Sequence, residues 1–170
     1  LHEQEQRHAR FDDTAYNLEP NVKESPGGLR DLQAVLWILR SLDLGDDWRA
    51  LVKQGLISQS ELRLIRKHEQ HLQMLRIRLH YMAKRREDRL IFDLQNELAQ
   101  ELGFVNTKRH RASEQLMRDY YKSAKAVNLF NEILLRSLKE LALPESIEIK
   151  PINVLKPMNK IGNIVFPTFI

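Results

Sequence analysis

The segment Asn17-Leu-Glu-Pro-Asn-Val-Lys-Glu-Ser-Pro-Gly-Gly-Leu-Arg-Asp31 decides how this chain of 170 residues is organised. Its two prolines, Pro20 and Pro26, lack a backbone N–H and exclude a continuous helix. Its two glycines, Gly27 and Gly28, permit positive φ and allow another group to approach closely. A strong amphipathic pattern begins immediately after them, so the segment is predicted to be a turn that opens a helix.

A glycine turn that opens a helix presents free backbone N–H groups at the positive end of the helix dipole. Lys23 and Arg30 flank this turn with two full positive charges. Such an arrangement is suited to a phosphate or a carboxylate, and the candidate ligands are Lys23, Gly27, Gly28 and Arg30. The alternative is purely structural, because Pro-Gly-Gly also serves as a plain turn before a helix and the two cations can simply be solvated.

Hydrophobic periodicity predicts an all-α fold, an up-and-down bundle of about five helices, in residues 27–143. Apolar residues recur at intervals of three and four, and capping residues and glycines delimit each stretch. The expected helices span residues 28–41, 46–53, 58–85, 89–102 and 113–141. Residues 2–10 are compatible with the end of a further helix, and Asn131 interrupts the apolar face of the last one.

The two ends of the chain differ in composition from the bundle. Residues 1–26 are expected to be the connection from a missing preceding domain, with an irregular Pro/Gly segment before the bundle. Residues 144–170 are rich in β-branched residues and broken by prolines, so we expect an extended tail or linker with a short strand or hairpin. The chain starts without Met and with polar residues, as expected for a piece of a longer protein.

Composition excludes several classes of function. The chain has no cysteine, which rules out disulfides, thiolate catalysis and Cys-ligated zinc and fits a cytoplasmic protein. No apolar run approaches the roughly 18 residues of a membrane span. The net charge is +4, but the basic run at residues 84–86 is followed at once by Glu87 and Asp88 and carries no aromatic residues. We therefore expect neither nucleic-acid nor membrane binding.

No catalytic or metal site is predicted within this chain. His68 and His71 are one residue closer than the two histidines of a His-Glu-x-x-His zinc motif, and no third ligand follows them. Asp12 and Asp13 are adjacent, so they diverge and favour a surface turn. The chain contains no P-loop, no dinucleotide fingerprint and no set of nucleophile, base and orienting group.

Three motifs carry a resemblance to a known family: Asn17-Leu-Glu-Pro, Asn21-x-Lys23 and Ser25-Pro-Gly-Gly-Leu-Arg-Asp31. Together they closely resemble the segment after the nucleotidyltransferase domain of the bifunctional PII uridylyltransferase/uridylyl-removing enzymes (GlnD). Two later stretches, Arg89-Leu-Ile-Phe-Asp93 and Met117-x-Asp-Tyr-Tyr121, look like landmarks of the same helical domain. The resemblance covers about residues 10–142. A looser Lys…Gly-Gly-x-Arg-Asp version resembles that of glutamine synthetase adenylyltransferases, and CBS-domain-linked nucleotidyltransferase-like proteins carry a related helical region.

The resemblance implies a cytoplasmic, multifunctional transferase of nitrogen regulation. Its parent enzyme is expected to move UMP from UTP onto the PII signal protein, and to remove it again when glutamine is high. Mg²⁺ is expected on the aspartates of the preceding nucleotidyltransferase domain, and a following HD domain performs the removal. This chain has no Gly-Ser followed by Asp-x-Asp and no His-Asp, so it is expected to bind no cofactor and to be inactive alone.

For the turn, the resemblance implies that the four candidate ligands lie near the nucleotide phosphates. Asp31 would then orient Arg30 or the neighbouring backbone, with Asn21 as a weaker orienting candidate. The alternative is a non-catalytic interaction or scaffold module that docks PII or relays glutamine sensing, with the turn fixing the angle between two domains. A further alternative is the equivalent domain of a CBS-linked nucleotidyltransferase-like protein.

Overall fold

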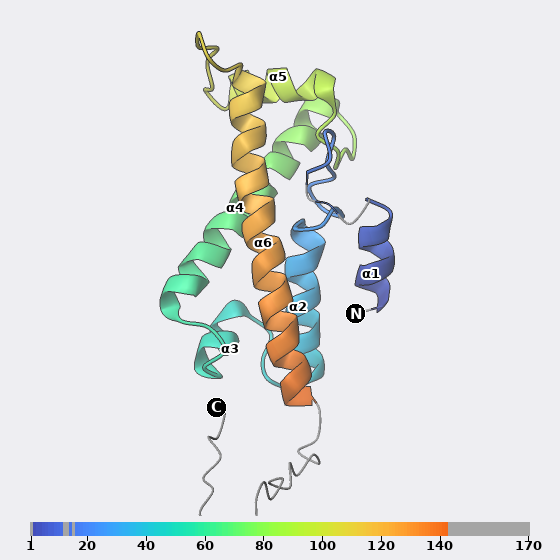
Figure 1. Ribbon diagram of the computed structural model, residues 1–170, viewed down its shortest axis with the longest axis vertical. Helices are drawn as coiled ribbons and strands as arrows, with labels where there is room; N and C mark the ends of the chain where they lie inside the picture. Colours follow the sequence, from blue (N-terminus) through green and yellow to red (C-terminus); the bar gives the residue numbers. More distant parts are fainter. Residues whose placement is uncertain (1, 12–13, 15, 143–170) are drawn as a thin grey trace, which may run out of the picture.

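The computed structural model describes residues 2–11, 14 and 16–142, and these residues contain six α-helices and no strand (Figure 1). The helices are α1 (His2–Ala9), α2 (Leu29–Ser41), α3 (Trp48–Lys53), α4 (Gln59–Ala83), α5 (Phe92–Glu101) and α6 (Ala112–Ala142). The all-α prediction is confirmed: the five expected helices are present, and residues compatible with a further helix form α1. The predicted tail at residues 144–170 lies outside the described residues, and the predicted domain boundaries stay predictions.

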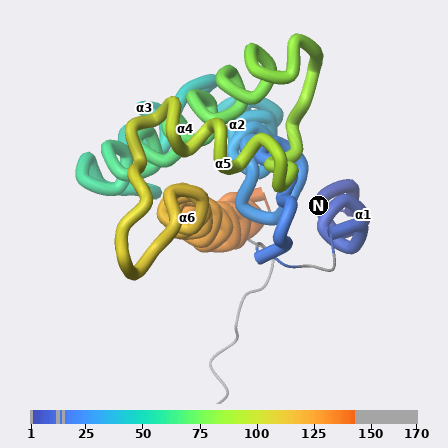
Figure 2. The backbone as a smooth tube through the Cα atoms, turned by 90° about the horizontal axis from the view of Figure 1, so that it is seen from above, coloured from blue at the N-terminus to red at the C-terminus, as the bar shows by residue number. Residues whose placement is uncertain are grey.

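The long helix α6 is the axis of the bundle. It runs along the length of the molecule and packs against α2, α4 and α5, while α3 packs against α4 (Figures 1 and 2). Followed along the chain in Figure 1, α2 descends, α4 rises and α6 descends again, which is the up-and-down order expected from the sequence. Figure 2 shows α1 at the edge of the bundle, beside the segment that leads into α2.

Side-chain caps fix where two of the helices begin. Ser58 and Glu61 form a reciprocal capping box: the Ser58 hydroxyl accepts from the Glu61 N–H (3.2 Å), and the Glu61 carboxylate accepts from the Ser58 N–H (2.7 Å). Asp47 caps α3 by accepting from the Ala50 N–H at 3.0 Å. Both caps replace hydrogen bonds that the first turn of a helix cannot make internally.

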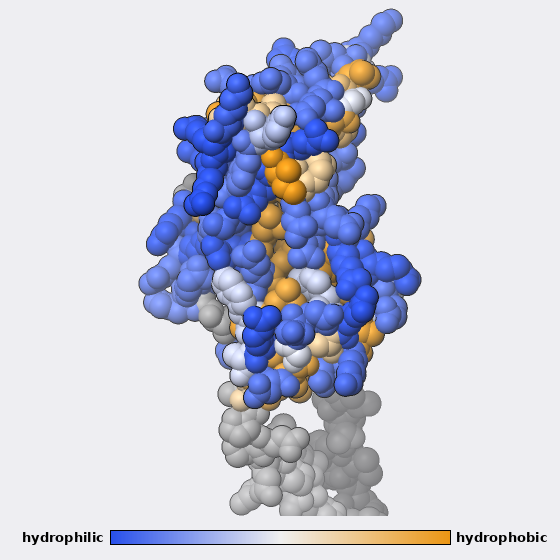
Figure 3. Space-filling view, turned by 180° about the vertical axis from the view of Figure 1, so that it is seen from behind, coloured by the Kyte–Doolittle hydropathy of each residue, from blue (hydrophilic) through white to orange (hydrophobic). Residues whose placement is uncertain are grey.

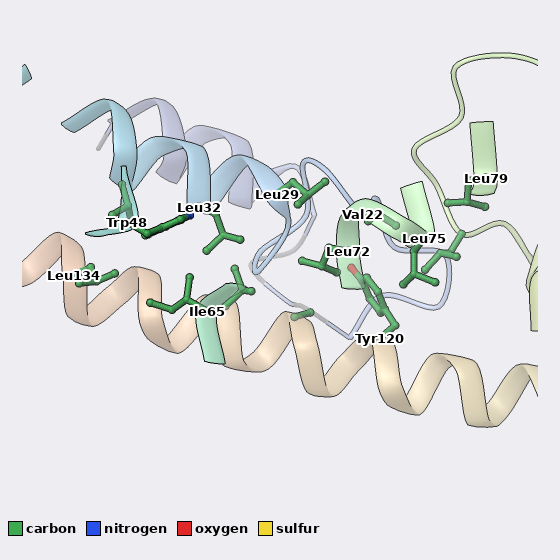
Figure 4. Close-up of a cluster of buried hydrophobic side chains, with 14 of the residues drawn as sticks. Val22, Leu29, Leu32, Trp48, Ile65, Leu72, Leu75, Leu79, Tyr120 and Leu134 are labelled. Carbon is green, nitrogen blue, oxygen red and sulfur yellow. The ribbon is translucent and has the colours of Figure 1, made fainter. Parts of the chain in front are cut away.

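One hydrophobic core joins the helices to the turn before α2. Side chains from α2, α3 and α4 point toward α6, and Tyr120 of α6 lies among Leu72, Leu75 and Val22 (Figure 4). Val22 belongs to the turn segment and is fully buried. The turn is therefore anchored in the core rather than attached to its surface.

One face of the molecule is mostly polar. Figure 3 shows a largely hydrophilic face crossed along the long axis by a narrow hydrophobic band. Among the described helices, none has the length and apolar character of a membrane span.

Candidate functional site

The turn is held in place first by backbone pairing. Asn21 and Arg89 form an isolated antiparallel bridge. On either side of it, the Val22 N–H donates to the Asp88 carbonyl (2.8 Å) and the Leu90 N–H donates to the Pro20 carbonyl (2.9 Å). The segment before α2 is thus fastened to the segment before α5, although the two are far apart in the sequence.

The backbone N–H groups of the turn are already occupied, so the expectation of free N–H groups was wrong. The chain before α2 curls back under the helix, and its carbonyls accept the hydrogen bonds that a ligand would otherwise take. The N–H groups of residues 28–31 donate to the carbonyls of Ser25 (2.8 Å), Val22 (3.0 Å), Lys23 (2.9 Å) and Gly28 (3.1 Å), in that order. Side chains are therefore better placed than these backbone N–H groups to bind an anion at the helix start.

The two glycines are required by packing. Gly27 has φ +76°, and a Cβ on it would lie 2.0 Å from the carbonyl oxygen of Ala124 in α6. A Cβ on Gly28 would lie 2.7 Å from the carbonyl oxygen of Lys23. The turn therefore touches both α6 and itself at distances that no other residue permits. A direct role of either glycine in phosphate binding stays a prediction.

Asp31 is the centre of the site, a fully buried carboxylate bound by four groups. Three of them come from α1: Arg7 Nη2 at 2.8 Å, His8 Nε2 at 2.9 Å and Gln4 Nε2 at 3.2 Å, all to Oδ1. The fourth is the Gly27 N–H, 2.7 Å from Oδ2. Burial alone would raise the pKa of the Asp31 carboxyl, but the hydrogen bonds from His8 and Arg7 hold that pKa below its usual value. Asp31 is therefore an anion in the fold.

The two predicted orienting residues both act on the backbone of the turn. Asp31 fixes Gly27 as described. The side-chain amide oxygen of Asn21, Oδ1, accepts from the backbone N–H groups of Lys23 (3.0 Å) and Glu24 (2.8 Å). The Ser25 hydroxyl in turn accepts from the Asn21 N–H at 2.9 Å. These contacts fix the backbone at Lys23 and so the direction in which its side chain projects.

Lys23 and Arg30 share one carboxylate, Glu24. Lys23 Nζ lies 3.2 Å and Arg30 Nη2 lies 3.1 Å from the same oxygen, Glu24 Oε1. Burial raises the pKa of Glu24, and the bonds to Arg30 and Lys23 outweigh it, so this pKa is lowered. The Arg30 guanidinium also lies 5.4 Å from the centre of the Trp37 ring, in cation–π geometry. Two partly exposed cations facing one carboxylate leave an excess of positive charge at the start of α2.

Sequence reasoning missed the contribution of α1. Gln4, Arg7 and His8 recur at intervals of three and four, which places them on one face of a helix. The helix buries Gln4 and Arg7 rather than apolar residues, so hydrophobic periodicity could not reveal its contact face. The polar spacing was the available signal.

A second polar cluster joins α4 to α6. His68 Nδ1 and His71 Nδ1 lie 3.1 Å and 2.8 Å from the hydroxyl oxygen of Ser123, beside a cavity of about 290 Å³ that Asp119 also lines. One hydroxyl can donate to one imidazole while accepting from the other. Within residues 2–11, 14 and 16–142, no three His, Cys, Asp or Glu side chains are grouped to hold a metal ion.

The histidine cluster makes stability depend on pH. Burial lowers the pKa of both His68 and His71; Asp119 opposes this at His71, and the charge of Lys67 adds to it at both histidines. Unfolding releases them to an ordinary pKa of about 6.5, so the unfolded chain binds more protons below that value. Their contribution is thus present above about pH 6.5 and declines as the pH falls. The free energy of unfolding can be measured with urea at about pH 7 and about pH 5. We expect it to decrease more over this range in the wild-type chain than in the His68→Gln/His71→Gln double variant. Equal losses would contradict this assignment.

Comparison with known proteins gives a consistent set of matches. A family model described as GlnD PII-uridylyltransferase matches residues 1–135. A bifunctional uridylyltransferase/uridylyl-removing enzyme of Chromobacterium violaceum is 55% identical over 137 residues, which are 81% of this chain and 16% of the relative. Relatives of the same description from Burkholderia orbicola and Nitrosospira multiformis are each 53% identical over 84% of this chain, and the matches cover 17% and 16% of the relatives.

The chain spans about one sixth of the length of the curated relatives it matches. No solved structure gives a significant match.

Proposed function

The chain belongs to the GlnD PII-uridylyltransferase family, and from this premise we propose that it is the helical domain that supports UMP transfer from UTP to the PII signal protein in nitrogen regulation. In this proposal the bundle is a scaffold, and the turn at residues 21–31 lies near the nucleotide phosphates in the cleft of a preceding nucleotidyltransferase domain. A following HD domain removes UMP. The enzyme acts in the cytoplasm.

The shared carboxylate of Lys23 and Arg30 is the observation that carries the proposal. Both cations are partly exposed and both are held by Glu24. A phosphate oxygen can therefore take the place of the Glu24 carboxylate at each cation without a large rearrangement. Charged donors held in place before the reaction stabilise the charge that develops on a triphosphate or on departing pyrophosphate. Trp37 helps to keep the guanidinium of Arg30 at this position.

Mg²⁺ does not fit the residues around the turn. Asp31 is fully buried and already accepts from Arg7, His8 and Gly27, while Glu24 forms ion pairs with three cations, Lys23, Arg30 and Arg7. A hard cation needs carboxylate oxygens that are not neutralised in this way. We assign the metal to the preceding domain, and this chain contributes positive charge only.

The contact between α1 and Asp31 supports a second role for the same turn. Arg7, His8 and Gln4 attach α1 to the start of α2 through a single buried carboxylate. Since α1 lies on the side of the chain that precedes the bundle, this contact would fix the angle between the preceding domain and the turn. A fixed angle is what electrostatic stabilisation requires, because it depends on the position of the cations.

The test is UMP transfer and UMP removal, measured separately in the full-length enzyme with Arg30→Ala. We expect transfer to fall by about 10², as the loss of one transition-state contact can cause, while removal and the melting temperature stay unchanged. Arg40→Ala is the matched control, because Arg40 is exposed in the last turn of the same helix. It is expected to leave transfer unchanged.

Two results would count against the proposal. If both activities and the melting temperature fall together, Arg30 is structural. If Arg30→Ala behaves like Arg40→Ala, the positive charge at the start of α2 takes no part in the reaction.

A further inference from the structure

An apolar groove of about 680 Å³ lies between the segment before the turn, α5 and the first half of α6. Tyr16 and Phe92 are 58% and 57% exposed in it, and Leu18 is also exposed. Met117 and Tyr121 line the groove from α6. Large apolar side chains gathered in one hollow usually mark a contact surface, whereas single exposed ones do not.

The walls of this groove are held by hydrogen bonds. The Tyr121 hydroxyl donates to the Asn17 carbonyl at 3.0 Å, and the Gln95 amide donates to the Leu18 carbonyl at 2.9 Å. The Phe92 N–H donates to the Glu19 carboxylate at 2.9 Å. A groove that is formed before its occupant arrives loses little conformational entropy on binding.

Four cations border the apolar floor, three of them on α6 and one, Arg111, immediately before it. Arg111, Arg118 and Lys125 are seven residues apart, and Lys122 lies between the last two. Residues seven apart lie nearly above one another on a helix, so Arg118, Lys122 and Lys125 form a stripe about 10 Å long on α6, and Arg111 lines the same groove just before the helix begins. Glu114 is the one acidic residue that lines the groove. Among the described residues, Lys122 alone of the four cations has an ion-pair partner, Asp119 at 3.2 Å.

We propose that this groove receives an acidic amphipathic helix from another domain of the same protein. A helix lying along α6 would place apolar residues on the floor and a row of Glu or Asp side chains over the stripe, as in helix-in-groove recognition. This proposal depends on the proposed function in one respect only, which is that the full-length protein contains further domains. The relatives carry about five sixths of their length outside the matched region, and a domain in the same chain is present at a high effective concentration.

This docking surface adjoins the turn. The segment that carries Tyr16 and Leu18 continues directly into Asn21, and Glu19 is bonded to both the start of α5 and Arg89. A helix in the groove would therefore cover residues that precede the turn by only a few positions. The docked domain would lie beside the segment that leads into the turn.

Hydroxyl-radical footprinting tests the proposal without any activity measurement, so its failure is distinguishable from that of the proposed function. The labelling of Tyr16 and Phe92 is compared between the 170-residue chain and the full-length protein. Tyr81 is the internal reference, because it is 82% exposed and does not line the groove. We expect Tyr16 and Phe92 to be labelled roughly tenfold less in the full-length protein, with Tyr81 unchanged.

Charge reversal then tests the acidic character of the occupant. Lys122→Glu/Lys125→Glu in the full-length protein is expected to restore the labelling of Tyr16 and Phe92. Arg136→Glu/Lys139→Glu is the matched control, with the same charge change and spacing on the exposed surface of α6 outside the groove. It is expected to leave the protection intact.

Several results would overturn the proposal. Equal labelling in the two proteins means that the groove is open, and protection that survives the reversal at Lys122 and Lys125 means that the occupant is not acidic. Protection that appears only on addition of a second protein assigns the groove to a separate partner. Protection that rises with protein concentration assigns it to a second copy of the chain.

Discussion

Replacing Asp31 with alanine is expected to lower the free energy of unfolding by about 3–5 kcal/mol. The carboxylate is 0% exposed, and Arg7, itself buried, lies 2.8 Å from it. Without Asp31 the Arg7 guanidinium keeps its charge but loses its main partner, and the Gly27 N–H loses its acceptor. The loss can be measured by urea unfolding of the 170-residue chain.

A similar but more exposed cluster provides the matched control. Asp88 also binds an arginine and a histidine, Arg76 at 2.6 Å and His80 at 2.8 Å, but its side chain is 20% exposed. Water can replace the lost carboxylate there, so Asp88→Ala is expected to cost about 1 kcal/mol. A cost for Asp31→Ala no greater than that for Asp88→Ala would show that the buried carboxylate does not hold the turn.

A double-mutant cycle separates the ion pair from the rest of the Asp31 site. Arg7→Met and Asp31→Leu each remove one side of the 2.8 Å ion pair and leave the other charge with fewer partners, whereas the double variant removes both charges of the pair. We therefore expect the double variant to be more stable than the sum of the two losses predicts. Additive losses would mean that Arg7 and Asp31 act independently.

Replacing Gly27 with alanine is the second change with a large expected effect, a loss of more than about 3 kcal/mol. A left-handed φ of +76° costs an alanine about 1–2 kcal/mol. In addition, its Cβ would lie 2.0 Å from the carbonyl oxygen of Ala124, a backbone atom in the middle of α6 that cannot move aside by itself. The turn would have to separate from α6, which would expose Val22.

Gly55→Ala isolates the contribution of the steric overlap. Gly55 has nearly the same φ, +72°, but a Cβ there meets no atom within 4 Å. Its replacement is expected to cost only the conformational part, about 1–2 kcal/mol. Failure of Gly27→Ala to fold, with Gly55→Ala folded, supports the same conclusion. Equal unfolding free energies of the two variants would contradict it.

The helices could be predicted from the sequence because their signals are local. The capping box of Ser58 and Glu61 and the apolar spacing after it predict a helix at residues 58–85, and α4 spans Gln59–Ala83. Lys84 ends α4 in the left-handed conformation, with φ 51°, a feature that sequence periodicity does not indicate. Asn131 is buried on α6 at the predicted interruption of the apolar face.

The arrangement of the turn could not be predicted because it depends on contacts between distant residues. The N–H groups at the start of α2 are occupied by carbonyls of the preceding segment, a consequence of the path that the buried Val22 imposes. Asp31 is bound by Arg7, 24 residues away. Residue types alone could indicate a cationic turn at Lys23 and Arg30, but not that Glu24 lies between these two side chains.

The central claim is that Lys23 and Arg30 act on the phosphates during UMP transfer. The most direct measurement is inhibition of transfer by pyrophosphate in the full-length enzyme, in the wild type, Lys23→Ala, Arg30→Ala and Arg40→Ala. A charged hydrogen bond to phosphate contributes enough that each of the first two substitutions should weaken inhibition roughly tenfold, with Arg40→Ala unchanged. Unchanged inhibition in both Lys23→Ala and Arg30→Ala would contradict the claim and leave the turn as a structural joint between domains.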